Sequence, residues 1–262
     1  MAWEWLRIGL NMSTYRFAGR DGADLACLET GSGRPLIMLH GFLGTGAHTL
    51  EHGRAYVFAE QGHRVVLPDL RGHGDSAKAH DRAAYPPDVL ADDGLALVEH
   101  LGLGDGEYDL SGYSLGARIV VRMLARGAKP GRAIVAGQGL AKVSGPQGGG
   151  QNERVLTALA TGVPLEPDSP DARFAHWITD FGADPRALLY MLNSLVPTPE
   201  DALRQITTPT LVAIGDQDER SDADELAALL PDARFVRVPG DHGSALSAPE
   251  LAAAMLAFLA EG

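Results

Sequence analysis

The feature that most constrains the fold is the alternation of short apolar runs with longer segments of helical pattern. The apolar runs that read as strands are 36–39 (LIML), 64–68 (RVVLP), 108–110, 133–136 (AIVA), 211–214 (LVAI) and 235–238 (FVRV). Such an alternation is typical of a mostly parallel sheet covered by helices. Two weaker alternating segments, 15–17 and 24–29, come first and suit an antiparallel edge. The pattern therefore predicts an α/β fold with an eight-stranded sheet.

The helical pattern divides the chain into two parts. Helices are expected over 87–101, from 119 to 124, over 222–230 and over 249–260. Between 141 and 206 the alternation stops: a glycine-rich stretch, 144–150, which we expect to be flexible, precedes helical segments at 153–161, 171–181 and 185–195. We therefore expect a core of 12–140 and 207–262, a helical insertion of 141–206 and an N-terminal extension of 1–11.

Composition limits the partners and the compartment. The net charge is −12, from 34 acidic and 22 basic residues, and this field repels nucleic acid and anionic membranes. Cys27 is the single cysteine, so neither an intramolecular disulfide nor a cysteine-based metal site is expected. No apolar run reaches the roughly 18 to 20 residues of a membrane span, and the first residues do not resemble a signal peptide. These features predict a cytoplasmic protein with no membrane or nucleic-acid partner, and they leave its oligomeric state open.

The stretch DLSGYSLGAR (109–118) places a serine between an expected strand and an expected helix. Gly112-x-Ser114-x-Gly116 in this context matches the nucleophile elbow, a sharp turn that raises a serine hydroxyl above a sheet. The alternative is a turn of small residues with no chemical role. Ser111, earlier in the strand, is expected to be structural. Asp109 has no partner that the sequence identifies, although its strand should be buried.

A nucleophilic serine needs a base, and the base needs an acid. His242 follows the last expected strand in VPGDHGSALSAPE, whereas His48 and most of the other histidines are expected in loops or on solvated helix faces. After the strand LVAIG come two candidate acids, Asp216 and Asp218. The order serine, aspartate, histidine is the one expected when each residue follows a strand of such a sheet.

Negative charge on a reacting carbonyl oxygen requires N–H donors that are already in place. The N–H of Leu115, directly after Ser114, is one candidate because it opens a helix. The second is the N–H of Phe42, in the glycine-rich loop HGFLGTG (40–46) that follows an expected strand. The alternative is that these glycines only shape a turn.

Taken together, the motifs HGFLG (40–44), DLRGHGDS (69–76), GYSLG (112–116), GDQD (215–218) and DHG (241–243) resemble, in identity and order, those of the α/β-hydrolase-fold enzymes. The resemblance implies a mostly parallel eight-stranded sheet flanked by helices, with residues 141–206 as a helical cap. It favours Asp218 over Asp216, because the family pattern runs G-x-x-D. It implies that DLRGHGDS is a structural turn, and that no metal or cofactor takes part.

The expected function is that of a serine hydrolase. Ser114, Asp218 and His242 would cleave a small or medium, mostly uncharged and apolar ester, thioester or lactone through an acyl-enzyme, with Phe42 and Leu115 as the oxyanion donors. Phe42, Tyr113 and Trp177 are the expected substrate-binding residues. Alternatives on the same residues are carbon–carbon bond hydrolysis and a cofactor-free perhydrolase or haloperoxidase reaction. A different class is a small-molecule receptor with slow or no turnover.

Overall fold

The structure is a computed structural model that describes residues 11–146 and 150–261. Within these ranges the chain forms a sheet in the order β1-β2-β4-β3-β5-β6-β7-β8. The strands are β1 (Met12–Ala18), β2 (Asp24–Gly31), β3 (Arg34–Leu39), β4 (His63–Pro68), β5 (Asp109–Tyr113), β6 (Ala133–Ala136), β7 (Thr210–Gly215) and β8 (Ala233–Val238). β1 and β2 pair antiparallel, β2 pairs antiparallel with β4, and the other pairs are parallel. The predicted mostly parallel eight-stranded α/β fold is confirmed.

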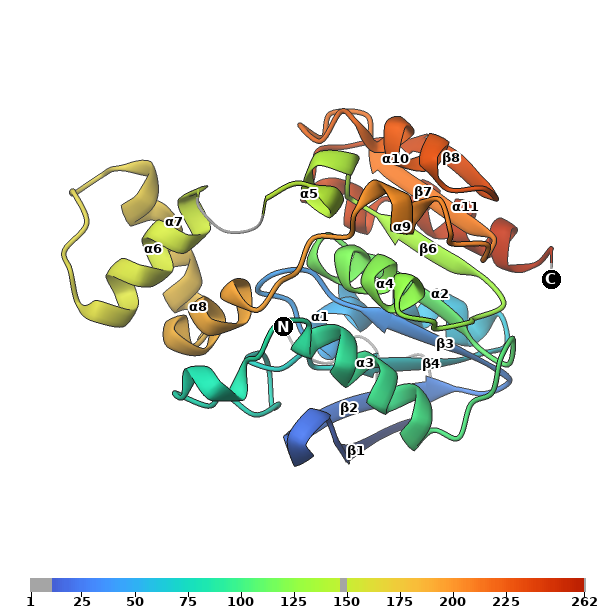
Figure 1. Ribbon diagram of the computed structural model, residues 1–262, viewed down its shortest axis with the longest axis horizontal. Helices are drawn as coiled ribbons and strands as arrows, with labels where there is room; N and C mark the ends of the chain where they lie inside the picture. The colour runs from blue at the N-terminus through green and yellow to red at the C-terminus, as the bar shows by residue number, and fades with distance from the viewer. Residues whose placement is uncertain (1–10, 147–149, 262) are drawn as a thin grey trace.

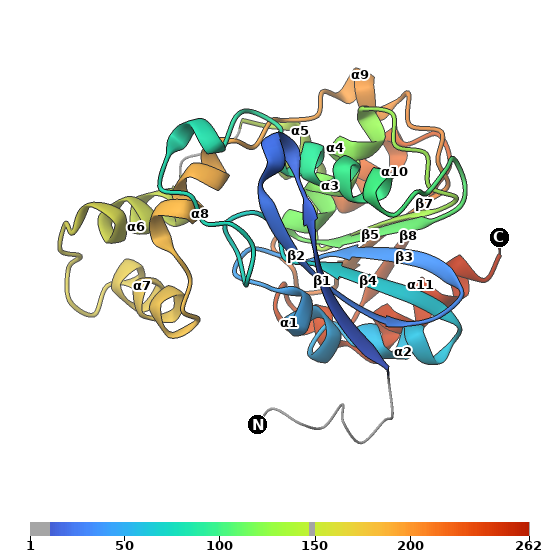
Figure 2. The same cartoon turned by 90° about the horizontal axis from the view of Figure 1, so that it is seen from below.

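The described residues also form helices, some on the two faces of the sheet and some beyond it. They are α1 (Gly46–Glu51), α2 (Ala55–Glu60), α3 (Val89–His100), α4 (Leu115–Ala125), α5 (Leu140–Ser144), α6 (Gly150–Thr161), α7 (Pro170–Asp180), α8 (Pro185–Asn193), α9 (Glu200–Leu203), α10 (Ala223–Leu229) and α11 (Pro249–Leu259). Seen from below, α3, α4 and α10 lie on one face and α1, α2 and α11 on the other (Figure 2). Figure 1 shows α6, α7 and α8 set apart from the sheet, beyond one end of it.

The alternation of side chains along β3 explains why the core has two halves. Leu36 and Met38 pack with α1, α2 and α11, whereas Ile37 and Leu39 pack on the opposite side with α3 and α4. Successive residues of a strand point to opposite faces, so a strand that is covered on both sides is apolar throughout. The edge strands β1 and β8 instead bury one residue each, Phe17 and Val238, and their other residues are exposed or half-buried.

Sequence signals explain where two of the helices, α7 and α8, begin. Ser169 and Asp184 accept hydrogen bonds from backbone N–H groups of the first turns of α7 and α8, and each is followed by proline at the first helical position. The expected long helices are present, with ends that differ by a few residues. Four short helices, α1, α2, α5 and α9, were not predicted, because four to six residues are too few to show a helical period.

Parts of two expectations lie outside the described residues. The proposed N-terminal extension covers 1–11, of which only Asn11 is described; its carbonyl accepts a hydrogen bond from Thr30 Oγ1 at 3.2 Å, and β1 begins at the next residue. Within the glycine-rich stretch 144–150, residues 147–149 are not described. Its first residue, Ser144, ends α5, and its last, Gly150, begins α6.

Asp109, for which the sequence identified no partner, lies at the start of β5 with 1% of its surface exposed. Arg34 of the neighbouring strand β3 donates to both carboxylate oxygens, from Nε at 2.6 Å and from Nη2 at 3.0 Å. The backbone N–H of Arg132 donates a third hydrogen bond at 2.9 Å. The carboxylate therefore ties three segments together at the amino end of the sheet, away from Ser114.

Within the described residues, no helix is both long enough and apolar enough to cross a membrane.

Candidate active site

The strand order changes direction between β3 and β5, and this position fixes where a site can form. The chain moves outward from β3 to β4 on one side and from β5 to β6 on the other. The loops at the carboxyl ends of two such strands diverge and leave a crevice between them. The HGFLG loop follows β3, and Ser114 follows β5.

Ser114 occupies the turn between β5 and α4 with a backbone φ of 53° and ψ of −111°, a strained conformation for a residue with a side chain. The flanking glycines make this turn possible. A Cβ on Gly112 would overlap the Gly116 backbone, and a Cβ on Gly116 would overlap the carbonyl of Leu39. The turn therefore packs directly against β3, and its geometry is that of a nucleophile elbow.

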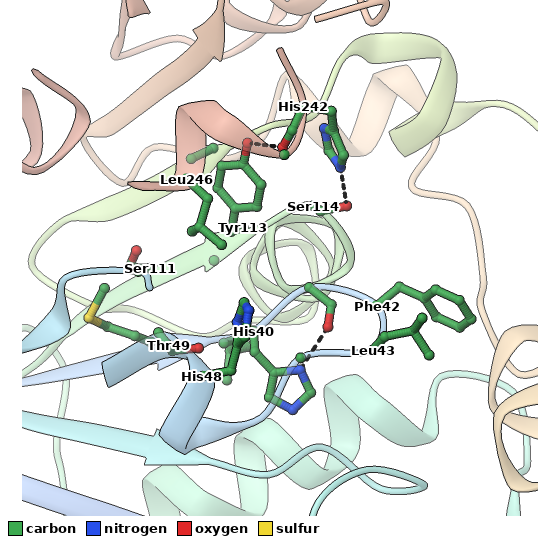
Figure 3. Close-up of a pocket in the computed structure, with 18 of the residues that line it drawn as sticks. His40, Phe42, Leu43, His48, Thr49, Ser111, Tyr113, Ser114, His242 and Leu246 are labelled. Carbon is green, nitrogen blue, oxygen red and sulfur yellow. Dashed lines mark hydrogen bonds between the residues drawn. The ribbon is translucent and has the colours of Figure 1, made fainter. Parts of the chain in front are cut away.

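Ser114, His242 and Asp218 form a continuous hydrogen-bonded chain. His242 Nε2 lies 2.9 Å from Ser114 Oγ, and His242 Nδ1 lies 2.7 Å from Asp218 Oδ2 (Figure 3 shows the first of these contacts). A carboxylate only accepts, so the neutral imidazole carries its proton on Nδ1 and leaves Nε2 to accept the serine hydroxyl hydrogen. Arg220 donates to the other carboxylate oxygen, Oδ1, from Nη1 at 2.9 Å and from its backbone N–H at 3.1 Å.

The surroundings keep His242 neutral and Asp218 ionised. Burial lowers the pKa of His242 and the Arg220 guanidinium lowers it further, against the opposing pull of Asp218. Burial alone would raise the pKa of Asp218, but hydrogen bonds from His242 and Arg220 outweigh it and hold that pKa below its usual range. A neutral histidine oriented by an ionised carboxylate can accept a proton from a serine.

Asp216, the other candidate acid, has a different position. Its Oδ1 accepts the backbone N–H of Gly240 at 2.9 Å, and it fixes the loop that leads to His242. The next turn is held by Asp241, whose Oδ1 accepts the N–H groups of Gly243 and Ser244. Tyr113 Oη donates to the carbonyl of His242 at 2.6 Å. These contacts set the position of the imidazole.

The HGFLG loop runs beside Ser114. A Cβ on Gly41 would lie 3.4 Å from Ser114 Cβ. The Gly41 carbonyl accepts from Gly44 N–H at 2.9 Å and from His40 Nδ1 at 2.8 Å. Because N–H and C=O point in opposite directions across a trans peptide, the N–H of Phe42 is turned away from these donors. The N–H of Leu115 belongs to the first turn of α4, whose amides have no acceptor within the helix.

The DLRGHGDS segment supports this loop. The N–H of Leu70 donates to His40 Nε2 at 3.0 Å, so the His40 ring is neutral and donates from Nδ1. Burial lowers the pKa of His40 to about 4 and that of His73, which packs edge-on against it, to about 3. Asp69 accepts the N–H groups of Gly46 and Asp75. The segment is a structural turn beside the site, as the resemblance implies.

A cavity of about 290 Å³ opens at Ser114 (Figure 3). Phe42, Tyr113 and Trp177, the expected substrate-binding residues, all line it. Its walls come from the loop after β3, from β5, α1 and α11, and from Trp177 and Phe181 of the helical insertion; the latter two side chains are each 47% exposed. None of the lining residues is Asp, Glu, Lys or Arg.

Two further residues, His48 and Ser111, line the cavity although the sequence did not assign them to it. His48 was expected on a solvated surface; it is half-buried in α1 and contacts Phe181, with ring centroids 6.3 Å apart. Ser111 was expected to be structural; it is 3% exposed, and it also lines the cavity. The signal for Ser111 was its register: it lies two residues before Tyr113 and therefore on the same face of β5.

Within the described residues, no group of three or more His, Cys, Asp or Glu side chains is placed to hold a metal ion.

Comparisons with known proteins agree with this geometry. A family model described as "Alpha/beta hydrolase family" matches residues 36–255. The chain is 28% identical to a non-heme haloperoxidase of Rhodococcus erythropolis, over 91% of this chain and 97% of that protein. It superposes on an esterase from Thermogutta terrifontis with a TM-score of 0.75 at 22% identity, covering 95% of this chain and 98% of that one. A similar match, with a TM-score of 0.72 at 22% identity and covering 90% and 96% of the two chains, is the putative non-heme bromoperoxidase BpoC of Mycobacterium tuberculosis. The chain belongs to the alpha/beta hydrolase family.

Proposed function

We propose that the protein is a serine hydrolase that cleaves small or medium, uncharged esters, thioesters or lactones through an acyl-enzyme on Ser114. The observation that carries this proposal is the hydrogen-bonded chain from Ser114 through His242 to Asp218 at the opening of the cavity. No Asp, Glu, Lys or Arg side chain lines the cavity. This favours an uncharged substrate, because a charged group buried there would have no counter-charge.

In the first half of the reaction, Ser114 Oγ attacks the carbonyl carbon and its proton passes to His242 Nε2. The carbonyl oxygen takes the negative charge, which the N–H groups of Phe42 and Leu115 stabilise. As the carbonyl re-forms, the bond to the leaving group breaks, and His242 returns the proton to the departing alcohol or thiol. Asp218 stays ionised throughout and stabilises the imidazolium.

In the second half, water replaces the leaving group. The water oxygen attacks the acyl carbon while His242 Nε2 takes a proton from that water. The bond to Ser114 Oγ then breaks, and the serine recovers its proton from Nε2 as the acid leaves. Every proton transfer in both halves uses His242 Nε2, so the reaction needs no acid or base other than His242.

We also propose that residues 141–206 act as a cap over a core of 12–140 and 207–262. This proposal is supported by the contribution of Trp177 and Phe181 to the cavity wall and by the separation of α6, α7 and α8 from the sheet (Figure 1). A half-exposed aromatic pair at a cavity opening is suited to contact a bound apolar group.

A second candidate is the perhydrolase reaction on the same serine, and the haloperoxidase relative of similar length favours it. Hydrogen peroxide would attack the acyl-enzyme in place of water, giving a peracid and free Ser114. The peracid could then oxidise a halide, being reduced to the carboxylic acid. Halogenation that requires both a carboxylic acid and peroxide, and that is lost in Ser114→Ala, would support this reaction.

The experiment for the main proposal is labelling with a fluorophosphonate, followed by peptide mapping and ester kinetics. We expect the label on Ser114 and loss of turnover in Ser114→Ala, while Ser13→Ala, changed at an exposed serine of β1, keeps both. Turnover that survives in Ser114→Ala would overturn the mechanism. Labelling of Ser114 without turnover of any ester would favour a receptor on this scaffold.

A further inference from the structure

The cavity extends inward from Ser114 along one face of the sheet. Its sheet side includes Met38 of β3, Ser111 of β5 and Ala136 of β6, and its opposite side is built from α1 and α11. In Figure 3, Ser111 lies well to the left of Ser114, and the side chains of Tyr113 and Leu246 are drawn between them in this view. The cavity therefore offers room for a substrate group beneath the reacting carbonyl, between the sheet and α11.

The Ser111 hydroxyl lines this cavity with no hydrogen-bond partner among the residues that the structure describes. Ser111 as a residue is 3% exposed. The other hydroxyl nearby, that of Thr49 in α1, is already paired, because it donates to the carbonyl of Thr45 at 3.0 Å. The hydroxyl is not among the polar side-chain atoms that are sealed off without a partner, so it faces the open space of the cavity, where a group that enters can pair with it. Around it the wall is apolar, with Met38, Leu251 and Met255 among its residues.

The charge of the lining restricts what can meet this hydroxyl. No lining residue is Asp, Glu, Lys or Arg, and burial, aided by His52, lowers the pKa of His48 and keeps its ring neutral. A carboxylate or ammonium group would be buried here without a counter-charge. A neutral oxygen, in contrast, can accept the hydrogen of Ser111.

We propose that this part of the cavity binds the acyl group of the substrate, and that Ser111 selects medium-length acyl chains that carry a neutral oxygen function, such as an ether, ketone or hydroxyl. This inference rests on the proposed hydrolase function. Three residues of extended strand span about 10 Å, so the oxygen lies several carbons from the scissile carbonyl. The preferred substrate class is therefore oxygenated acyl esters rather than plain alkanoates.

The test compares p-nitrophenyl hexanoate with analogues in which one methylene at the γ, δ or ε position is replaced by an ether oxygen. These esters have nearly the same shape. The ratio of their kcat/KM values therefore measures the effect of the ether oxygen as a hydrogen-bond acceptor. For one position we expect the wild type to prefer the ether about fivefold, which corresponds to one net hydrogen bond. In Ser111→Ala this preference should fall to about one or below, whatever the change in kcat/KM on hexanoate itself.

Fluorophosphonate titration of Ser114 gives the concentration of active sites in each variant, and Ser111→Cys, which keeps the size but weakens the donor, should be intermediate. Ser13→Ala should keep the wild-type ratio. Equal ratios in wild type and Ser111→Ala at all three positions would overturn the assignment of Ser111 while leaving the hydrolase intact. Absence of Ser114 labelling together with absence of ester turnover would instead overturn the proposed function itself.

Discussion

Arg220 and His242 hold opposite oxygens of one carboxylate: Nη1 of Arg220 lies 2.9 Å from Asp218 Oδ1, and Nδ1 of His242 lies 2.7 Å from Asp218 Oδ2. The carboxylate stays buried and ionised because it is bonded from both sides. Arg220 also offsets part of the negative charge that would otherwise make the imidazole more basic. Its position thus links the acid to the pH at which His242 can act as a base.

Replacing Arg220 with methionine should move the acid limb of the kcat/KM profile to higher pH. Arg220 lowers the pKa of His242, so its removal raises that pKa, and a larger fraction of His242 is protonated and inactive below neutrality. The measurement is a pH–rate profile on an uncharged ester. Arg220→Lys keeps the positive charge, so its acid limb should lie close to that of the wild type. Arg204→Met, which breaks an exposed ion pair with Glu200, should leave the limb unmoved. An unmoved limb in Arg220→Met would contradict this role.

Exchanging each candidate acid for its amide should separate Asp218 from Asp216. Asp218→Asn should lower kcat by about 10⁴-fold, by analogy with serine proteases, because an amide no longer holds the imidazole in the tautomer that accepts from serine. Asp216→Asn keeps an oxygen for Gly240 N–H, so kcat should stay within about threefold. Steady-state kinetics on both proteins decide the matter: a comparable loss in the two variants, or a loss confined to Asp216→Asn, would reverse the assignment.

The sequence was sufficient for those features that depend on local pattern. The strand–turn–helix around Ser114 was predicted because two glycines at fixed spacing are what a close approach to β3 requires. The choice between Asp216 and Asp218 could not be made by spacing alone, since both follow β7. The choice depends on the folded turn, in which the N–H of Gly240 donates to the carboxylate of Asp216.

Features that depend on distant packing were beyond the sequence. Arg34 and Asp109 are 75 residues apart and meet only because β3 and β5 are neighbours in the sheet. Ser111 and His48 line the cavity because β5 and α1 face each other across it. Helix α1 is too short for its sequence to show a helical period. Which face of β5 borders the cavity depends on the order of the strands in the sheet.

Removing the Tyr113 hydroxyl should impair catalysis more than binding. It donates to the His242 carbonyl at 2.6 Å and restrains the loop that carries the imidazole. One net hydrogen bond is worth about 1 kcal/mol, so Tyr113→Phe should lower kcat about fivefold with KM little changed. Tyr56→Phe, at a partly buried tyrosine of α2 that does not line the cavity, is the control. Wild-type kcat in Tyr113→Phe would show that the loop is positioned without this bond.

The Asp109 carboxylate should be important for stability and unimportant for chemistry. It accepts two hydrogen bonds from Arg34 and one from Arg132 N–H while almost fully buried, at the amino end of β5. Asp109→Ala should therefore lower the free energy of unfolding by about 2–4 kcal/mol, because a buried N–H and a guanidinium lose their partner.

Urea unfolding measures this loss, and with active-site titration each folded molecule of Asp109→Ala should show the wild-type kcat. The matched control is Asp105→Ala, which breaks an ion pair with Lys129 whose side chains are 72% and 67% exposed. Solvent screens such a pair, so its loss should change the free energy of unfolding by no more than about 0.5 kcal/mol. Equal stability of Asp109→Ala and Asp105→Ala would mean that the buried bonds to Asp109 contribute no more than a surface pair.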